Sequence, residues 1–207
     1  METDVKPGVE QRSPDERLRR LAVEVMEPDV REPLGAYLFW NDEPGAELAR
    51  HVEQSVFFEE FGETPEIFAR EAGPYEAASL FICVIDHLRR LPAGVMRVVV
   101  PSPAGFKSLN DIEAVWGESA ETLIERTGMG LELQRTWDVA TLAVLPDYRK
   151  LATKGLVAMG LYQTVTRAAL ASGVRWLVAI FDMPAYRLLR WKLGMVFAGY
   201  TGIGPRP

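Results

Sequence analysis

Apolar positions in the first half of the chain follow two different periods. Residues 13–26 open with Ser-Pro-Asp-Glu, where a capping serine and a proline at the first helical position predict a helix. The segment PGAELARHVEQSVFFEEFG places apolar residues at turn spacing before a glycine, which predicts a second helix. In SLFICVIDHLRRLPAGVMRVVVP, two β-branched runs flank Pro-Ala-Gly, which predicts a hairpin that turns at those three residues.

The second half alternates between strand-like and helix-like segments. The pattern predicts a strand over 137–145, an amphipathic helix over 154–172, a buried strand over 175–181 and a short helix over 184–193. MVFAGYTGI is expected to form one more strand, and NDIEAVWGESAETLIERTG is helical or irregular. This order predicts an α/β chain whose second half contains a right-handed strand–helix–strand crossover.

Length and composition limit the kind of protein further. The 207 residues, 48% of them hydrophobic, are enough for one sizeable core, which we assign to a single domain over 13–207 after a mobile tail over 1–12. No apolar run approaches the roughly 18 residues of a membrane span, and the N-terminus lacks the apolar segment of a signal peptide, so we expect a cytoplasmic protein. The single cysteine, Cys83, excludes an internal disulfide and a cysteine-based zinc site.

The charge distribution is uneven. A net charge of −6 argues against nucleic-acid binding, which requires a basic face. Basic residues nevertheless gather in the last third of the chain: Arg149, Lys150, Lys154, Arg167, Arg175, Arg187, Arg190 and Lys192. Ordinary solvated faces explain such an asymmetry, and an anionic small ligand near the C-terminal half is the alternative.

One of these basic clusters lies between the strand 137–145 and the helix that follows it. The free N–H groups at the start of this helix point beyond the carboxyl end of the strand, where they and the helix dipole favour a phosphate group. Arg149, Lys150 and Lys154 add positive charge, and Gly155 allows a ligand to approach the backbone. Neither the P-loop spacing nor the dinucleotide-type glycine motif is present.

The same segment resembles the GNAT acyltransferase superfamily, in which a strand of the form xLxVxPxYR precedes a loop and helix that bind the pyrophosphate of acyl-coenzyme A. The matching residues are Leu142, Val144, Pro146, Tyr148 and Arg149. The loop here holds only one glycine. A later segment aligns on Lys192-Leu193-Gly194, where Met183 replaces the usual asparagine and Arg190 replaces the tyrosine that often protonates the departing thiolate. The likeness covers roughly residues 79–201 and implies a mixed, mostly antiparallel sheet with flanking helices.

A narrower resemblance is to the autoinducer-synthase branch of this superfamily and its N-acyl amino acid synthase relatives. GVMRVV supplies the Arg97 of the branch's first motif, and WDVATLAV supplies Trp137 and Asp138, with aspartate in place of glutamate and Thr141 in place of arginine. The branch acylates small amines. The resemblance therefore implies acyl-coenzyme A or an acyl-carrier protein as donor, a small-molecule amine as acceptor and no metal; it leaves a homodimer open.

Acyl transfer to an amine requires a proton acceptor, donors for the oxyanion and a proton for the thiol. Alternation along the strand gives Asp138 the same face as Ala140, Leu142 and Val144, so it is a carboxylate on an apolar side whose pKa burial would raise. We predict that Asp138 is the base; the alternative is a salt bridge with Arg97 or Arg135.

The resemblance implies the other site residues. It adds Arg97 to the catalytic set and implies backbone donors around Leu142, Ala143 and Val144. The predicted pyrophosphate group is Arg149, Lys150, Thr153, Lys154 and Gly155.

Two further residue types are weaker candidates. His51 and His87 are too far apart in the sequence to indicate a metal site. Phe57, Phe58, Phe61 and Phe68 form core, or alternatively line an acyl pocket.

The sequence therefore predicts a GNAT-type N-acyltransferase. The alternatives are a catalytically idle module that keeps the fold and binds acyl-coenzyme A, and a nucleotide-binding protein unrelated to acyl transfer.

Overall fold

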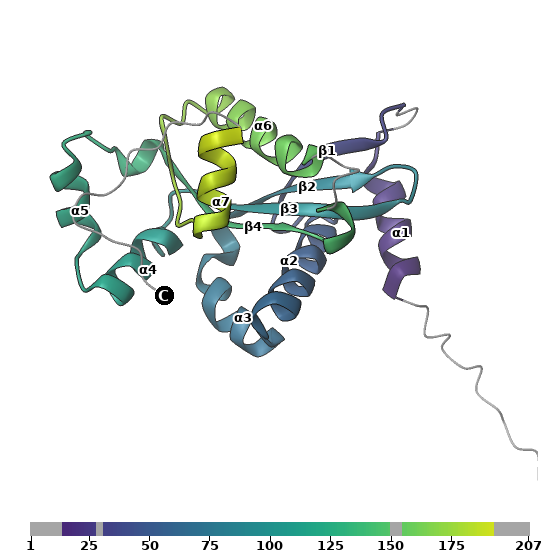
Figure 1. Cartoon of the computed structure of the whole chain (residues 1–207), viewed down its shortest axis with the longest axis horizontal. Coiled ribbons are helices and arrows are strands. Elements are labelled where there is room, and N and C mark those ends of the chain that lie inside the picture. Colours follow the sequence, from purple (N-terminus) through teal and green to yellow (C-terminus); the bar gives the residue numbers. More distant parts are fainter. Residues whose placement is uncertain (1–13, 28–30, 150–154, 193–207) are drawn as a thin grey trace, which may run out of the picture.

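A central sheet organises the chain. The computed structural model describes residues 14–27, 31–149 and 155–192 (Figure 1). Within them a five-stranded sheet has the order β1-β2-β3-β4-β5. The strands are β1 (Leu34–Trp40), β2 (Ser79–Asp86), β3 (Leu91–Val99), β4 (Thr136–Val144) and β5 (Trp176–Val178). Pairs β1–β2, β2–β3 and β3–β4 are antiparallel, and β4–β5 is parallel. The predicted mixed, mostly antiparallel sheet with flanking helices is therefore confirmed.

Helices cover both faces of this sheet (Figure 1). On one face lies α6 (Leu156–Ala171), which joins β4 to β5; on the other lie α1 (Pro14–Val25), α2 (Ala46–Phe61) and α3 (Pro65–Ala72). Between β3 and β4 come α4 (Lys107–Trp116) and α5 (Ala120–Thr127). Short turns η1 (Gly73–Ala78), η2 (Leu133–Arg135) and η3 (Pro146–Tyr148) join the longer elements, and α7 (Met183–Arg187) continues into the π-helical η5 (Leu188–Lys192). Among the described helices, none is long and apolar enough to cross a membrane.

The α6 face of the sheet is packed with apolar side chains. Alternate residues of β2, β3 and β4 point at α6, and they include Leu80, Ile82, Val84, Met96, Val98 and Val139. Gly94 of β3 lies directly under this helix, since a Cβ atom built there would come within 2.5 Å of Val157. The helix therefore packs closely on the sheet at its first turn.

The opposite face is covered in two parts. Under α1 and α2, Phe81, Cys83, Ile85 and Val95 form a second cluster. Further along the strands, η1 and α4 cover a third cluster around Val99. Cys83 is fully buried in the second cluster, which agrees with a structural thiol.

A bulge interrupts the pairing of β3 with β4. Arg97 pairs with Thr141, but the next residue along β3, Val98, pairs with Val139, so Ala140 has no partner across the ladder. Such an extra residue shifts the alternation of side chains by one position. Asp138 therefore shares its face with Thr141 and not with Leu142, which points to the α6 side.

Most elements predicted from periodicity are present. The structure confirms the two N-terminal helices, the β2–β3 hairpin and the β4–α6–β5 crossover, although β5 is shorter than expected. β1 and α3 were not predicted. The predicted position of the hairpin turn is wrong, because Pro-Ala-Gly lies inside β3. The turn lies at residues 87–90, where the Asp86 side chain accepts a hydrogen bond from the Arg89 N–H (2.9 Å). The predicted tail (1–12) and MVFAGYTGI strand lie outside the described residues.

Candidate active site

The sheet opens between β4 and β5. The two strands pair only at Thr136–Trp176, Trp137–Leu177 and Asp138–Val178, whereas β4 runs on to Val144. Beyond Asp138, one edge of β4 therefore has no described strand beside it. Opposite this edge, the N–H of Leu145 donates to the carbonyl of Ala93 on β3 (3.0 Å). Because backbone groups alternate in direction along a strand, the N–H groups of Leu142 and Val144 point to the open edge.

The start of α6 lies at the far end of this opening. Val157, in its first turn, comes close to both Gly94 and the side chain of Val144. Gly155 precedes the helix with φ of +74°, a left-handed conformation that glycine adopts without strain. The first N–H groups of a helix have no partners within it, so this end carries unsatisfied donors and the positive end of the helix dipole.

Of the predicted pyrophosphate group, only two residues are described. The Arg149 guanidinium forms an ion pair with Glu60 of α2, and its Nε donates to the carbonyl of Val144 (2.6 Å). Arg149 thus joins the end of β4 to α2 in this structure. Gly155 occupies the N-cap of α6, and Lys150, Thr153 and Lys154 lie outside the described residues.

Asp138 lies where β4 and β5 separate. Its carboxylate is fully buried and accepts two hydrogen bonds from Ser108 in the first turn of α4, one from the backbone N–H (2.8 Å) and one from Oγ (2.5 Å). Burial raises the pKa of Asp138 to about 6, although both Ser108 hydrogen bonds oppose the shift. The alternative of a salt bridge with Arg97 is wrong, because the carboxylate partners of that arginine are Glu53 and Glu76.

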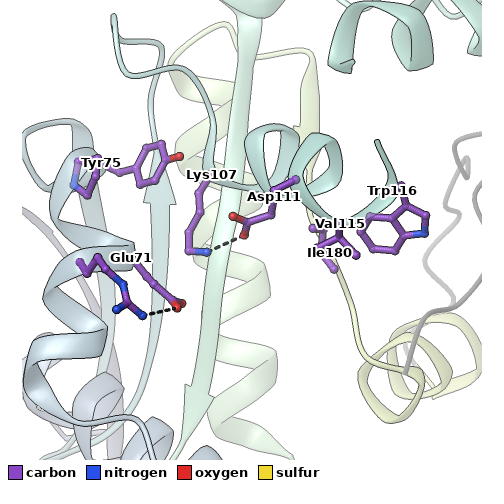
Figure 2. Close-up of a pocket in the computed structure, with 10 residues that line it drawn as sticks. Glu71, Tyr75, Lys107, Asp111, Val115, Trp116 and Ile180 are labelled. Atoms are coloured by element: carbon purple, nitrogen blue, oxygen red, sulfur yellow. Dashed lines mark hydrogen bonds and ion pairs between the residues drawn. The ribbon is translucent and has the colours of Figure 1, made fainter. Parts of the chain in front are cut away.

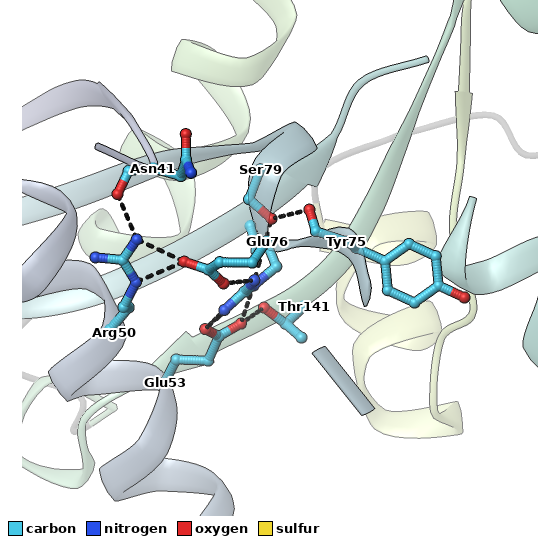
Figure 3. Close-up of polar contacts among 8 residues, drawn as sticks. Asn41, Arg50, Glu53, Tyr75, Glu76, Ser79 and Thr141 are labelled. Carbon is cyan, nitrogen blue, oxygen red and sulfur yellow. Dashed lines mark hydrogen bonds and ion pairs between the residues drawn. The ribbon is translucent and has the colours of Figure 1, made fainter. Parts of the chain in front are cut away.

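Arg97 lies inside a buried polar cluster with Glu53 of α2, Glu76 and Ser79, and Figure 3 shows how these three partners lie. Its guanidinium contacts Glu53 through Nε (3.0 Å) and Nη2 (2.7 Å), and Glu76 through Nη1 (2.7 Å). Only 1% of the side chain is exposed. Burial disfavours the charged guanidinium, but the two carboxylates more than offset this and raise the pKa of Arg97. A cation in this position acts on neighbouring protein groups and does not reach a ligand by itself.

A cleft of about 480 Å³, which Asp138 does not line, lies on the same face of the sheet as Asp138 (Figure 2). Residues of α3 and η1 form one wall and residues of α4 the other. Its lining comprises Arg70, Glu71, Pro74, Tyr75, Lys107, Asp111, Ala114, Val115, Trp116 and Ile180. Lys107 and Asp111 form an ion pair across one turn of α4 (2.6 Å), and both act electrostatically on the Asp138 carboxylate. The cleft therefore combines apolar walls with charges of both signs.

The phenylalanines divide between core and surface. Phe68 is buried, while Phe58 and Phe61 are 59% and 68% exposed at the end of α2. The ring of Phe57 packs against Phe61 (centroids 5.5 Å apart) and Phe68 (5.9 Å). The interpretation of all four as plain core is therefore wrong for two of them.

The two histidines have different surroundings. His87 contacts the Tyr37 hydroxyl (2.9 Å) and the Glu32 carbonyl (2.6 Å). His51 lines a second cavity with Leu145 and Pro146, just beyond the end of β4, and burial lowers its pKa. In the described residues, no group of three or more histidine, cysteine or acidic side chains is arranged to hold a metal ion.

Tyr162 is a buried hydroxyl that the sequence analysis did not single out. On α6, Gly160 faces Val84 of β2 and Ala36 of β1, and Tyr162 lies about 200° further round the helix, on the flank away from these two strands. Burial raises the pKa of Tyr162 to about 12, and the charge of Asp182, beyond β5, adds to the shift. The sequence gave no signal for this residue, because it falls within the apolar stripe of the helix.

Ser108 was also missed. It follows the Phe106-Lys107 pair at the start of α4, and nothing near it in the sequence indicates a partner thirty residues away. Lys107 and Asp111 could have been found, because an i, i+4 pair of opposite charges is typical of one helix face.

Solved structures share this fold. The chain superimposes on the aminoglycoside 6′-N-acetyltransferase AAC(6')-Iy in complex with the bisubstrate analogue CoA-S-monomethyl-acetylneamine, with a TM-score of 0.53, 12% identity and coverage of 85% of this chain and 99% of that one. The same enzyme in complex with CoA gives a TM-score of 0.52, 12% identity and coverage of 87% and 99%. A ribosomal-protein-alanine N-acetyltransferase from Brucella melitensis gives 0.49, 14% identity and coverage of 84% and 99%.

These likenesses establish the architecture. The chain has the fold of the GNAT N-acetyltransferases, with a mostly antiparallel sheet that opens beyond its fourth strand. No protein-family model matches the sequence, and no curated protein matches it. The narrower resemblance to the autoinducer-synthase branch stays a prediction.

Proposed function

We propose that this protein is an N-acyltransferase that moves an acyl group from acyl-coenzyme A to the amine of a small molecule. The observation that carries the proposal is the opening between β4 and β5, onto which the N–H groups of Leu142 and Val144 are directed. The crystals of AAC(6')-Iy, which shares the fold, contain CoA and a bisubstrate analogue.

The donor fits the open edge of β4. In the proposed arrangement, the N–H groups of Leu142 and Val144 donate to the carbonyl oxygen of the thioester and stabilise the negative charge that develops there. The N-terminus of α6, at the end of this edge, supplies the donors for the pyrophosphate. Arg149, Lys150, Thr153 and Lys154 remain the candidate cationic and hydroxyl contacts, with Gly155 at the helix start.

The acceptor fits the cleft on the same face of the sheet as Asp138. Its amine nitrogen attacks the thioester carbonyl carbon, and the C–S bond breaks as the amide bond forms. The amine proton passes through Ser108 Oγ to Asp138, whose pKa of about 6 leaves it ionised at neutral pH and basic enough to accept a proton. Glu71 and Asp111 give the cleft carboxylates that attract a cationic amine.

The departing thiolate needs a hydrogen-bond donor, and Arg190 occupies the position where the superfamily often has a tyrosine. Tyr162 is the candidate replacement. Its hydroxyl stays protonated because its pKa is about 12, and its side chain lies on the flank of α6 away from β1 and β2.

The phenylalanine cluster at the end of α2 suggests a donor with a medium or long acyl chain. Phe58 and Phe61 expose apolar area that a chain would cover, at about 0.8 kcal/mol per buried methylene. We therefore expect octanoyl-coenzyme A to bind more tightly than acetyl-coenzyme A. Equal affinities would show that these rings serve another purpose. Octanoyl-loaded acyl-carrier protein belongs in the same comparison, because the donor can arrive in either form.

A binding module without turnover is the second candidate. It is favoured by Arg190, which stands where the superfamily often has the tyrosine that protonates the departing thiolate. The contacts of Arg149 with Glu60 and the Val144 carbonyl must rearrange in either case before its guanidinium can contact a phosphate. Such a protein would bind acyl-coenzyme A but release no free thiol with any amine.

Thermal unfolding with coenzyme A tests the donor site. A ligand that binds only the folded state raises the melting temperature, so millimolar coenzyme A should raise that of the wild type. Changing Arg149 and Lys154 together to Ala should reduce the shift, whereas Arg175→Ala, at the start of β5, should leave it unchanged. No shift in the wild type, or an undiminished shift in the double variant, contradicts the site. Thiol release with a panel of amino acids, polyamines and aminoglycosides then separates an enzyme from an idle module.

A further inference from the structure

Glu53 of α2 is a fully buried acid under the sheet, and it contacts two strands at once. Its side chain has no exposed surface. Both carboxylate oxygens accept hydrogen bonds from Arg97 of β3, and Oε1 also accepts one from the hydroxyl of Thr141 of β4. One side chain therefore links β3 and β4 from beneath (Figure 3).

The two linked residues flank the bulge. Arg97 and Thr141 are paired across the ladder, and the register changes immediately after them, where Ala140 is left out. Glu53 thus binds the last regular pair before the irregularity. The contacts of Glu53 therefore favour the register in which Ala140 is the extra residue.

Charge within the cluster is balanced. Arg97 reaches Glu76 (2.7 Å) and Ser79 Oγ (3.0 Å) with Nη1, and Glu76 also accepts from Nε of Arg50 (2.7 Å). The Arg97 guanidinium also lies over the ring of Phe81, 4.6 Å from its centroid. Two arginines thus face two carboxylates, so the charges within the cluster cancel. A buried ion pair does not by itself show that the cluster stabilises the protein, because apolar residues of similar volume in its place often give equal stability.

The presence of the bulge decides which backbone groups face the opening. Without the extra residue, 141–144 would shift by one position against β3, and the direction of each N–H in that segment would reverse. Leu142 and Val144 would then turn toward β3, and Ala143 toward the opening. The same shift would take the Thr141 hydroxyl away from Glu53 and into the apolar α6 face.

We propose that Glu53 is a positioning residue for the donor site. By holding Arg97 and Thr141 together as a pair it keeps Ala140 out of the ladder, and this extra residue sets the direction of the Leu142 and Val144 N–H groups. The inference rests on the proposed function, because those N–H groups are the ones assigned to the thioester carbonyl. The part that concerns the register of β4 is testable without a ligand.

Thr141 is the residue to change. Removing the carboxylate of Glu53 would leave a buried arginine without one of its partners. The resulting loss of stability could not be told apart from a change in the register of β4. Thr141→Val keeps the shape and β-branching but removes the hydroxyl, whereas Thr141→Ser keeps the hydroxyl. Ser79→Ala is the matched control, since it removes one hydrogen bond from the same Arg97 but lies away from the bulge.

Residue-resolved amide exchange by NMR gives the first readout. In the wild type, the N–H groups of Ala143 and Leu145 should exchange slowly because they face β3, and those of Leu142 and Val144 should exchange quickly. Thr141→Val should erase this difference, while Thr141→Ser and Ser79→Ala should retain it. Retention of the difference in Thr141→Val overturns the proposal, and so does its loss in Ser79→Ala.

The affinity for octanoyl-coenzyme A, which carries the thioester carbonyl, gives the second readout and is measured by calorimetry on the same four proteins. Thr141→Val should weaken binding about tenfold, which is the scale of one hydrogen bond, and Thr141→Ser should restore it. If Thr141→Val binds like the wild type, the positioning role is wrong. If the wild type binds no acyl-coenzyme A, the proposed function fails, and the exchange pattern still decides whether Glu53 sets the register.

Discussion

The two faces of the sheet bury different kinds of side chain. Toward α6 the strands present an apolar surface, with Leu80, Ile82, Met96 and Val98 at its centre. On the other face, the strand positions and the covering helices supply the buried polar side chains found in the described residues. These are Glu53, Ser79, Arg97, Ser108, Thr136, Asp138 and Thr141.

This difference suggests that the α6 face mainly stabilises the sheet and that the polar face mainly fixes how the strands and helices are arranged. Apolar burial has no direction, so many arrangements of the α6 face would stabilise the sheet about equally well. A buried charge is costly unless specific partners satisfy it, so each polar side chain on the other face restricts the arrangement around it. We therefore expect changes on the polar face to alter pH dependence, register and turnover. Changes to the α6 face, Tyr162 excepted, should alter stability alone.

The largest effect is expected from breaking the buried ion pair. Arg97→Met leaves Glu53 as a buried carboxylate without its cation, and removing one partner of such a pair costs about 3–5 kcal/mol of unfolding free energy. Urea denaturation of the variant measures this loss. Arg50→Met is the control, because Arg50 contacts Glu76 in the same cluster but is 30% exposed, and we expect a loss of about 1 kcal/mol. Equal losses of unfolding free energy in Arg97→Met and Arg50→Met would contradict the expectation that burial makes the Arg97 ion pair the more costly one to break.

The pH dependence of the unfolding free energy should reveal the raised pKa of Asp138. Its pKa is about 6 in the folded protein against an ordinary value of 3.8, so the folded state binds more protons than the unfolded state between these values. Its contribution to stability is therefore greatest in acid and falls as the pH rises from about 4 to about 6. At about 1.4 kcal/mol per pH unit, the fall amounts to about 3 kcal/mol.

Asp138→Asn cannot titrate, so the stability difference between wild type and variant should change by this amount over the same range. Chemical denaturation at several pH values measures it. A difference that stays constant from pH 4 to pH 7 would mean that the carboxylate is not desolvated as its burial indicates.

The same substitution should lower turnover by about 10²-fold or more if Asp138 accepts the amine proton. The amide keeps an acceptor for the Ser108 N–H, so coenzyme A affinity should change little. Ser108→Ala, which removes the Oγ between the acceptor and the carboxylate, should also lower turnover. Full activity of Asp138→Asn, together with lower thermal stability, would assign Asp138 a structural role only.

Elements with strong local periodicity were predictable. The β2–β3 hairpin and the β4–α6–β5 crossover rest on apolar patterns that the folded chain simply buries. The hairpin turn was misplaced because Pro92, Ala93 and Gly94 are typical turn residues, whereas here Gly94 is required by the close approach of Val157. β1 was missed because LGAYLFW, an edge strand, lacks a clear two-residue alternation.

The site was predictable only in part. The strand–helix corner and the resemblance to the superfamily led to the end of β4 at which the sheet opens, and Asp138 was recognised as a carboxylate on an apolar strand. Its partner Ser108, the Glu53–Arg97 pair and the Arg149–Glu60 pair join residues that are distant in sequence and meet only when the fold forms. The bulge at Ala140 has no local signature in the sequence either.

The smallest effects are expected on the α6 face, where two glycines allow a matched test. At Gly94, an added Cβ would lie 2.5 Å from Val157 Cγ1 and 3.2 Å from the Ala143 carbonyl, closer than packed atoms approach. Val157 is β-branched and sits in a helix, so it cannot rotate away easily. Gly94→Ala should therefore cost about 1–3 kcal/mol of unfolding free energy, the usual range for overpacking.

At Gly160, by contrast, a Cβ would lie 3.4 Å from Val84 and 3.9 Å from Ala36, which are ordinary contact distances. Gly160→Ala should stabilise the protein by about 0.5–1 kcal/mol, because alanine loses less backbone entropy than glycine in a helix. Thermal and urea unfolding measure both changes. Since neither glycine contacts the buried charges of the other face, coenzyme A affinity and the pH profile of Gly160→Ala should match the wild type. A shifted profile in that variant would mean that the α6 face also sets the geometry of the site, and the separation of roles between the two faces would be wrong.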